Sequence, residues 1–338
     1  MGFASHRYFV CRRGRRWQRG EVPAQTDEIT PLDLALHAAA YSPSLDLFLV
    51  AGDGQGANPY LASTPGAGGA WTQRGAAVAF NAVLNGLLWT GAAFVACGIR
   101  PASACFLRSA DGVAFTDQSN SGQGIECKAL AYNAAGNVLV GAGGPWNAFG
   151  CSATFKSIDG GLSWGANRSD LTGQGARWLY AICWTGTNFI AAGEPAADGH
   201  TNITYSPNGT QGNWTRVQPP NNLGATCYSL GFGNGKAVGA CSGNQFLVSS
   251  DNGLTWAIVA GPAGAGQFNA VLYTGRQWLV TTAAGELYAG RDISDLALLR
   301  TWGGALNAIA YNAAIGRAIL AGAPTGAGAR AVRLAGLA

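Results

Sequence analysis

The stretch S-I-D-G-G-L-S-W occupies residues 157–164, and nearly the same phrase, S-S-D-N-G-L-T-W, returns at 249–256. Both copies fit the pattern Ser-x-Asp-x-Gly-x-Ser/Thr-Trp. A phrase that recurs at long spacing indicates a repeat architecture, so the repeat has to be measured before any single element is interpreted. Looser copies of the phrase end at Trp71, Phe115, Trp214 and Trp302.

Two short apolar runs precede each copy of the phrase. The second run begins at Phe48, Phe94, Val138, Phe189, Ala237, Trp278 and Ala318, with successive spacings of 46, 44, 51, 48, 41 and 40 residues. Units of about 45 residues match the four-stranded blade of a β-propeller. The first runs are rich in small and apolar residues, as expected for strands around a central channel, and they lie at 37–41, 83–89, 129–132, 180–184, 228–232, 270–273 and 308–311. Helical periodicity and helix caps are almost absent, which predicts an all-β chain.

The predicted architecture is a single seven-bladed β-propeller over residues 1–338. The blades are expected at 36–79, 80–124, 125–175, 176–224, 225–267, 268–305 and 306–338. The last unit lacks a fourth strand at its own end. The segment G-R-R-W-Q-R-G at 14–20 resembles A-W-T-Q-R-G at 70–75. We therefore expect residues 1–20 to supply the closing strand of the last blade, which would remove an exposed sheet edge.

Composition restricts the classes of partner. The chain has 338 residues, of which 48% are hydrophobic and 11% charged, and its formal net charge is +4. This charge is small for the length, so nucleic acid is not expected as a partner. The five arginines between Arg12 and Arg19 are interpreted as the solvent face of an outer strand, with an anionic-surface patch as the alternative. Neither a signal peptide nor a membrane span is predicted, so synthesis in the cytoplasm without export is expected.

The cysteines and histidines show no metal-binding pattern. Eight cysteines lack Cys-x-x-Cys or Cys/His spacing, and the three histidines are scattered, so neither a metal nor a cofactor is predicted. Cys97 and Cys105 flank one loop, and Cys227 and Cys241 flank a turn. Each pair is predicted to lie nearly opposite across a hairpin and to form a disulfide if the register allows. In a reducing compartment they would instead be buried thiols.

On its two complete phrases and the looser copies, the chain resembles the Asp-box (BNR-repeat) β-propellers. The resemblance implies that each box forms a hairpin turn between the third and fourth strands of a blade, on the rim. In such a turn Ser and Asp bond backbone amides, Gly adopts positive φ and Trp packs between sheets. The structural box residues are Ser157, Asp159, Gly161, Trp164, Ser249, Asp251, Gly253 and Trp256.

Sialidases share this repeat, but their catalytic pattern is not found. The resemblance would require an arginine triad, a Tyr/Glu pair and an acidic Asp, together with an Arg-Ile-Pro signature that is absent. No pair of carboxylates is separated in a way that indicates an acid and a base. We therefore expect a protein that is not an enzyme and has no catalytic residues. A sialidase-like glycoside hydrolase remains an alternative.

The loops after the second strand are long in the first four units, at 52–59, 98–104, 143–150 and 193–202. On a propeller they share one face with the blade-to-blade connections, and loops on a rigid scaffold are frequent binding sites. The candidate binding residues on this face are Asp53, Arg100, Trp146, Phe149, Glu194, Asp198 and His200.

The resemblance also suggests a biological setting. Compact Asp-box propellers without a signal peptide or enzyme signature are similar to components of phage virions. The hypothesis is a non-enzymatic structural or recognition protein in a tail, a fibre or a capsid-attached position. Its partners would be other virion proteins or a cell-surface glycan or receptor. The alternatives are a lectin-like carbohydrate-binding propeller and an intracellular assembly factor similar to photosystem-assembly propellers. All of these rest on fold analogy.

Overall fold

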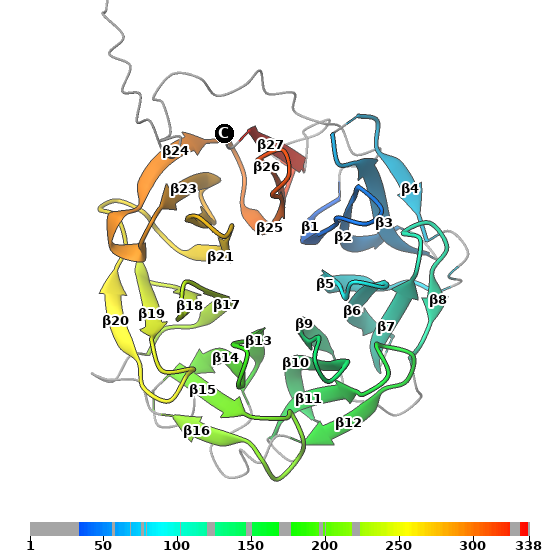
Figure 1. The fold of residues 1–338 in the computed structure, drawn as a ribbon, viewed down its shortest axis with the longest axis horizontal. Coiled ribbons are helices and arrows are strands. Elements are labelled where there is room, and N and C mark those ends of the chain that lie inside the picture. Colours follow the sequence, from blue (N-terminus) through cyan, green and yellow to red (C-terminus); the bar gives the residue numbers. More distant parts are fainter. Residues whose placement is uncertain are drawn as a thin grey trace, which may run out of the picture.

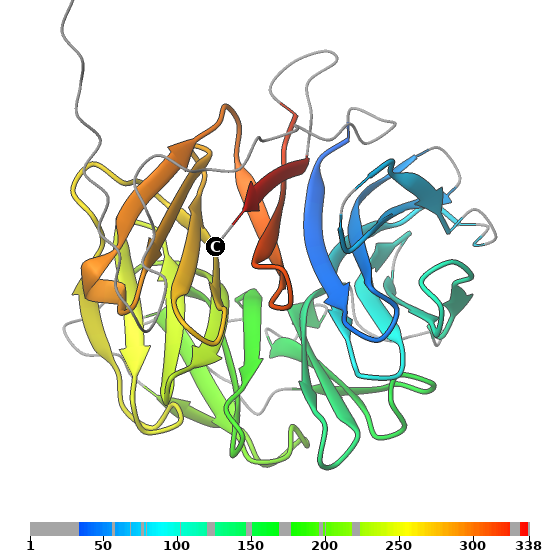
Figure 2. The same cartoon turned by 45° about the horizontal axis from the view of Figure 1, so that its top comes forward.

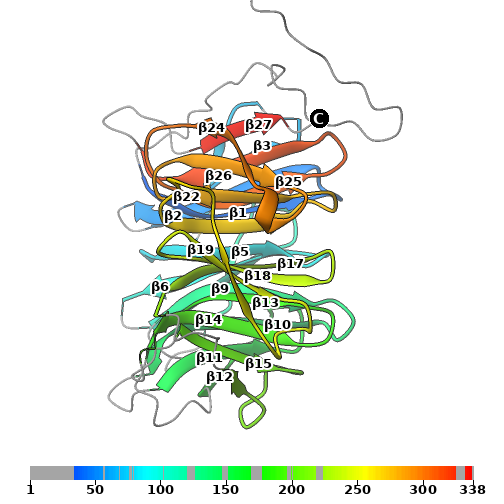
Figure 3. The same cartoon turned by 90° about the vertical axis from the view of Figure 1, so that its left-hand side faces the viewer.

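The protein is described by a computed structural model over residues 34–55, 58–67, 69–75, 78, 80–101, 103–119, 126–146, 151–168, 177–195, 199, 201–217, 224–324 and 332–336. These residues form antiparallel sheets arranged radially around a central axis (Figure 1). Seen from the side, the sheets form a disc (Figure 3). The described regular structure is all strand except for one short 3-10 helix, η3 (Ile293–Asp295). The predicted all-β propeller class is confirmed.

Six of the sheets contain four strands each, in sequence order from the axis to the rim. The first three are β1 (Leu36–Ser42), β2 (Leu47–Gln55), β3 (Asn58–Pro65) and β4 (Thr72–Arg74); β5 (Val83–Trp89), β6 (Phe94–Arg100), β7 (Ser103–Ser109) and β8 (Thr116–Asp117); and β9 (Cys127–Asn133), β10 (Val138–Trp146), β11 (Cys151–Ser157) and β12 (Gly165–Arg168). The next three are β13 (Leu179–Trp184), β14 (Phe189–Pro195), β15 (Thr201–Ser206) and β16 (Thr215–Val217); β17 (Cys227–Gly233), β18 (Lys236–Cys241), β19 (Gln245–Ser249) and β20 (Ala257–Ala260); and β21 (Phe268–Tyr273), β22 (Trp278–Thr282), β23 (Glu286–Gly290) and β24 (Ala297–Thr301).

The prediction of seven blades closed by the N-terminal strand was wrong. Six blades are complete, and the remaining sheet has three strands, β25 (Leu306–Asn312), β26 (Arg317–Gly322) and β27 (Val332–Gly336). Among the described residues no fourth strand pairs with β27, and residues 1–20, the predicted closing strand, lie outside them. The described contact with the first blade consists of side-chain packing, in which Ile319 and Ala321 share a core cluster with Phe48 and Val50, and of a hydrogen bond from the Asn307 side chain to the Leu36 carbonyl. Figure 2 shows the last sheet, in orange to red, beside the first blade, in blue.

The core lies between neighbouring sheets. Leu49 and Leu61 of the first blade pack with Leu84 and Phe94 of the second, and similar clusters fill the other contacts between adjacent blades. The second strand of a blade is covered on both faces, which favours a continuous apolar run in place of the alternation seen in half-exposed sheets. All five residues of β22 are buried accordingly.

The two complete phrases form matching turns between a third and a fourth strand. The Asp159 Oδ1 atom accepts from the hydroxyl of Ser157 at 2.7 Å and from the amides of Leu162 and Ser163, both at 3.0 Å. Asp251 accepts equivalent bonds from Ser249, Leu254 and Thr255. Gly161 and Gly253 have φ of 89° and 90°, a region that favours glycine. Trp164 stacks on Phe106 of the preceding blade with ring centroids 4.0 Å apart. These residues therefore hold the turns together and fix them to the neighbouring sheet.

Candidate functional site

Each of the seven inner strands carries a β-bulge at the same position. The strand register skips one residue there, and that residue has a polar group or a hydroxyl: His37, Asn85, Lys128, Tyr180, Tyr228, Asn269 and Asn307. A bulge inserts an unpaired residue and changes the direction of its side chain. All seven residues line the same end of the central channel. We refer to these seven residues as the mouth ring.

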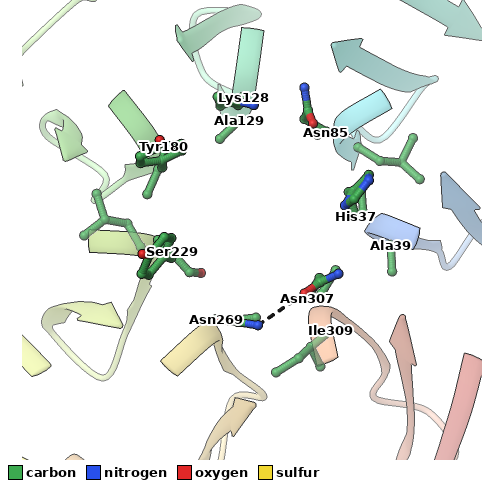
Figure 4. A pocket seen from close by; sticks show the side chains of 18 of the residues that line it. His37, Ala39, Asn85, Lys128, Ala129, Tyr180, Ser229, Asn269, Asn307 and Ile309 are labelled. Atoms are coloured by element: carbon green, nitrogen blue, oxygen red, sulfur yellow. Dashed lines mark hydrogen bonds between the residues drawn. The ribbon is translucent and has the colours of Figure 1, made fainter. Parts of the chain in front are cut away.

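The mouth ring opens into a cavity of about 340 Å³ on the axis of the propeller (Figure 4). In each inner strand the ring residue is followed by a small residue. The residue after that is aliphatic, and these residues form a layer below the ring: Ala39, Leu87, Leu130, Ile182, Leu230, Val271 and Ile309. The cavity therefore has a hydrogen-bonding entrance with a layer of aliphatic residues below it.

One half of the mouth is charged and aromatic. The ammonium of Lys128 donates to Glu126 Oε1 at 2.6 Å, and the side-chain amide of Asn85 donates to the same oxygen at 2.7 Å. The Lys128 ammonium also lies 5.0 Å from the centroid of the Trp178 ring, within the range of a cation–π contact. Glu126 thus connects the second and third blades, and Lys128 connects the third to the fourth.

Tyr180 and Glu194 extend this half of the mouth. The Tyr180 hydroxyl donates to Glu194 Oε1 at 2.9 Å, and the backbone amide of Trp178 donates to Oε2 at 3.3 Å. The rings of Tyr180 and Tyr228 have centroids 5.8 Å apart. Burial and the neighbouring Glu194 carboxylate raise the pKa of Tyr180 above its ordinary value. The phenol is therefore a protonated donor throughout the physiological pH range.

The other half of the mouth is built from amides. Gln267 donates to Asn269 Oδ1 at 2.8 Å, Asn269 donates to Asn307 Oδ1 at 3.2 Å, and Asn307 donates to the Leu36 carbonyl at 3.0 Å. Figure 4 shows the Asn269–Asn307 bond at the edge of the opening. The chain of bonds crosses from the sixth sheet through the last sheet to the first. It leaves carboxamide groups beside the entrance that can bond both donors and acceptors.

The structure brings two of the predicted binding residues to the mouth. Asp53 Oδ1 lies 2.8 Å from His37 Nε2, and Glu194 bonds Tyr180 as described. Arg100 bonds Ser103 and Asp117 of its own blade and does not line the cavity. The backbone of Trp146 ends β10. The Trp146 side chain and the residues Phe149, Asp198 and His200 lie outside the described structure.

The sequence did contain a signal for the mouth ring. Aligning the inner runs places the ring residue between an apolar residue and a small one in every unit: L-H-A, L-N-G, C-K-A, L-Y-A, C-Y-S, F-N-A and L-N-A, starting at 36, 84, 127, 179, 227, 268 and 306. The binding residues predicted from the sequence came from the loops after the second strands, and they did not include this aligned position. The polar position is recognisable from the sequence as soon as all the units are aligned.

The predicted disulfides differ in geometry. The register pairs Gly98 with Cys105, so Cys97 and Cys105 are offset by one residue and occupy different core clusters on opposite faces of the sheet. That predicted disulfide was therefore wrong. Cys227 does lie directly opposite Cys241, and both are free thiols in the structure. A disulfide between them under oxidising conditions stays a prediction.

The described residues contain no cluster of three or more His, Cys, Asp and Glu side chains arranged to hold a metal ion. Nor do they include a helix long and apolar enough to cross a membrane.

Comparison with known proteins places the fold in the β-propeller class. No family model and no curated protein matches the sequence. Two solved structures of YCF48 are similar in fold. The structure of YCF48 bound to D1 peptide has a TM-score of 0.66 and 13% identity, covering 94% of this chain and 100% of that one. YCF48 from Cyanidioschyzon merolae has a TM-score of 0.65 and 16% identity, covering 93% and 99%. At these identities the likeness establishes the propeller fold, and neither structure supports the Asp-box or phage resemblance.

Proposed function

We propose that this chain is a non-enzymatic propeller that binds a segment of another protein at the mouth ring. The observation that carries the proposal is the convergence of seven bulged residues on one end of a cavity of about 340 Å³. Concave sites with an apolar interior and a few convergent polar groups are typical binding sites. The bulge recurs in all seven inner strands, so it is a repeated feature of the chain.

A polypeptide segment suits the chemistry of the mouth. Its backbone offers alternating donors and acceptors, which the carboxamides of Asn269 and Asn307 can bond in either sense. Trp178, Tyr180 and Tyr228 add aromatic contact area of the kind enriched in protein interfaces. YCF48 is a propeller of similar fold that binds a D1 peptide, and this supports a peptide ligand by analogy.

Two carboxylates at the mouth, Glu126 and Glu194, accept hydrogen bonds from side chains of the mouth ring. Glu126 bonds both Lys128 and Asn85, and Glu194 bonds Tyr180 and the Trp178 amide. Each therefore fixes the position of ring side chains. This engagement supports a binding role in preference to an acid–base pair.

The Asp-box kinship and the virion setting are also proposals. The turns at Asp159 and Asp251 have matching hydrogen bonds, which supports a common repeat origin. A place in a phage tail, fibre or capsid rests on the sequence resemblance alone. Neighbouring genes that encode capsid and tail proteins would support this setting, whereas metabolic neighbours would oppose it.

The binding proposal can be tested by closing the channel. Ala129 lines the cavity directly after the ring residue Lys128, so the variant Ala129→Trp would place an indole in the channel below the mouth ring. Leu162→Trp on the rim is the matched control, because Leu162 is already 52% exposed. Immobilised wild-type protein should retain a specific partner from an extract of the source cells. We expect Ala129→Trp to retain at least about tenfold less partner than the wild type, because residues at the centre of an interface contribute most of its binding energy. Leu162→Trp should retain as much partner as the wild type. Equal retention by Ala129→Trp would refute the proposal, provided that both variants melt cooperatively.

A further inference from the structure

The charges at the mouth are unbalanced. Asp53, Glu126 and Glu194 supply three carboxylates next to the ring residues His37, Lys128 and Tyr180, whereas Lys128 is the single lysine or arginine of the mouth ring. Lys128 pairs with Glu126 at 2.6 Å, and His37 lies 2.8 Å from Asp53. Glu194 receives only the neutral donors Tyr180 and Trp178, and no described cation forms an ion pair with it. Its carboxylate therefore retains the capacity to pair with a cation of a ligand.

Three aromatic rings form a row that includes Tyr180, the residue whose hydroxyl bonds this carboxylate. Trp178 and Tyr180 stack with centroids 6.2 Å apart, and Tyr228 lies 5.8 Å beyond Tyr180. All three side chains are partly exposed. The Lys128 ammonium already lies 5.0 Å from the Trp178 ring and 5.9 Å from the Tyr180 ring. The same group of rings therefore already contacts one cation of the chain itself, and Tyr228 offers a further aromatic surface.

We infer that the partner segment presents an arginine side chain, which binds Glu194 beside the rings of Tyr180 and Tyr228. This inference rests on the proposed function and adds the chemistry of the ligand. A planar guanidinium can pair with a carboxylate and stack on an aromatic ring at once, which an ammonium does less well. Glu194 Oε2 accepts only a 3.3 Å bond from Trp178, so it retains capacity for a charged donor.

The test uses two small probes of equal shape. N-acetyl-arginine methylamide carries the guanidinium, and N-acetyl-citrulline methylamide replaces it with a neutral urea. Each probe is titrated into the full chain while the ring signals of Trp178, Tyr180 and Tyr228 are followed by NMR. The proteins compared are the wild type, Glu194→Gln and the control Glu286→Gln. The carboxamide introduced by Glu194→Gln keeps an acceptor for Tyr180. Glu286 lies on β23, where it accepts from Thr282, and in the described structure it bonds no residue of the mouth ring.

We expect saturable shifts with the arginine probe and binding about fivefold weaker with citrulline, in line with a cation–π contact assisted by a carboxylate. Glu194→Gln should remove this preference, and Glu286→Gln should preserve it. Equal binding of both probes, an unchanged preference in Glu194→Gln, or no shift with either probe would overturn the inference. The partner retention measured with Ala129→Trp is independent of these probes. A failure of arginine selectivity is thereby distinguished from a failure of binding at the mouth.

Discussion

The hydroxyl of Tyr180 donates a 2.9 Å hydrogen bond to the carboxylate of Glu194, joining the inner strand of a blade to the end of its second strand. His37 and Asp53 have the same relationship in the first blade, at 2.8 Å. In both blades the acidic residue also donates its backbone amide to the inner chain, Glu194 to the Trp178 carbonyl and Asp53 to the Ala35 carbonyl. In these two blades the second strand therefore positions the bulged residue of the first.

Removing the Tyr180 hydroxyl should weaken the fold as well as the mouth. In Tyr180→Phe the half-buried Glu194 loses its best described donor, which should cost about 1–3 kcal/mol of unfolding free energy, because a carboxylate is left less satisfied. Chemical denaturation measures this change. Tyr228→Phe is the control, since no described side-chain partner is assigned to its hydroxyl, and an equal loss in both variants would contradict the account.

The glycine at position 144 is required by Trp178. A Cβ at Gly144 would lie 2.1 Å from Cζ3 of the indole, so Gly144→Ala must displace the ring. We expect a shifted Trp178 signal in the NMR spectrum and a loss of about 1–3 kcal/mol, typical of overpacking. Gly266→Ala is the control, because a Cβ there meets nothing within 4 Å. A Trp178 signal that stays in place in Gly144→Ala would show that the packing described is incorrect.

The Asp159 turn should contribute stability that depends on pH. Burial alone would raise the pKa of Asp159, but hydrogen bonds led by those from Ser163 outweigh it and lower the pKa from 3.8 to about 2. Because the folded pKa is below the ordinary value, the contribution is complete above pH 3.8 and is lost as the pH falls towards 2. Asp159→Asn should thus be less stable than wild type at pH 7, and the difference should shrink between about pH 4 and pH 2. Thermal melting across this range measures it, and a constant difference would exclude the ionised carboxylate as the cause.

The described cysteines should be unreactive in the folded protein. Burial raises the pKa of Cys183 to about 12 and also raises that of Cys97, so little thiolate forms near neutral pH. Iodoacetamide should modify the six thiols that the structure describes as buried only after unfolding: Cys97, Cys105, Cys127, Cys183, Cys227 and Cys241. Mass spectrometry of peptides identifies the sites. Rapid native labelling of Cys183 would contradict its burial.

The sequence predicted the repeating elements better than their junctions. Phe94, Val138, Phe189 and Trp278 begin second strands as expected, because a strand covered on both faces has a continuous apolar run. The pairing of the closing strand could not be predicted in this way. The similarity between residues 14–20 and 70–75 predicts the same type of strand in both segments, but it does not specify which strand each one pairs with. The Cys97–Cys105 pairing failed since a register error of one residue reverses the face of a side chain.

The mouth ring was harder to predict because its geometry depends on bulges. In a regular strand, successive side chains point to opposite faces of the sheet. A bulge interrupts this alternation with an extra unpaired residue, and the pattern of apolar residues does not show where the bulge occurs. Asp53 and Glu194 were chosen from loop length, and the structure places them beside His37 and Tyr180. Their contacts with the ring could not be predicted until the seven inner strands were placed around one axis.

The most direct test of binding at the mouth is site-specific photo-crosslinking of the partner. p-Benzoylphenylalanine is introduced either at Asn307 in the mouth ring or at Leu254 on the rim, which is 47% exposed. The partner retained by wild-type protein should crosslink from position 307 and not from position 254, and the adduct should disappear when Ala129→Trp is introduced as a second substitution. Crosslinking from position 254 with none from position 307 would contradict binding at the mouth.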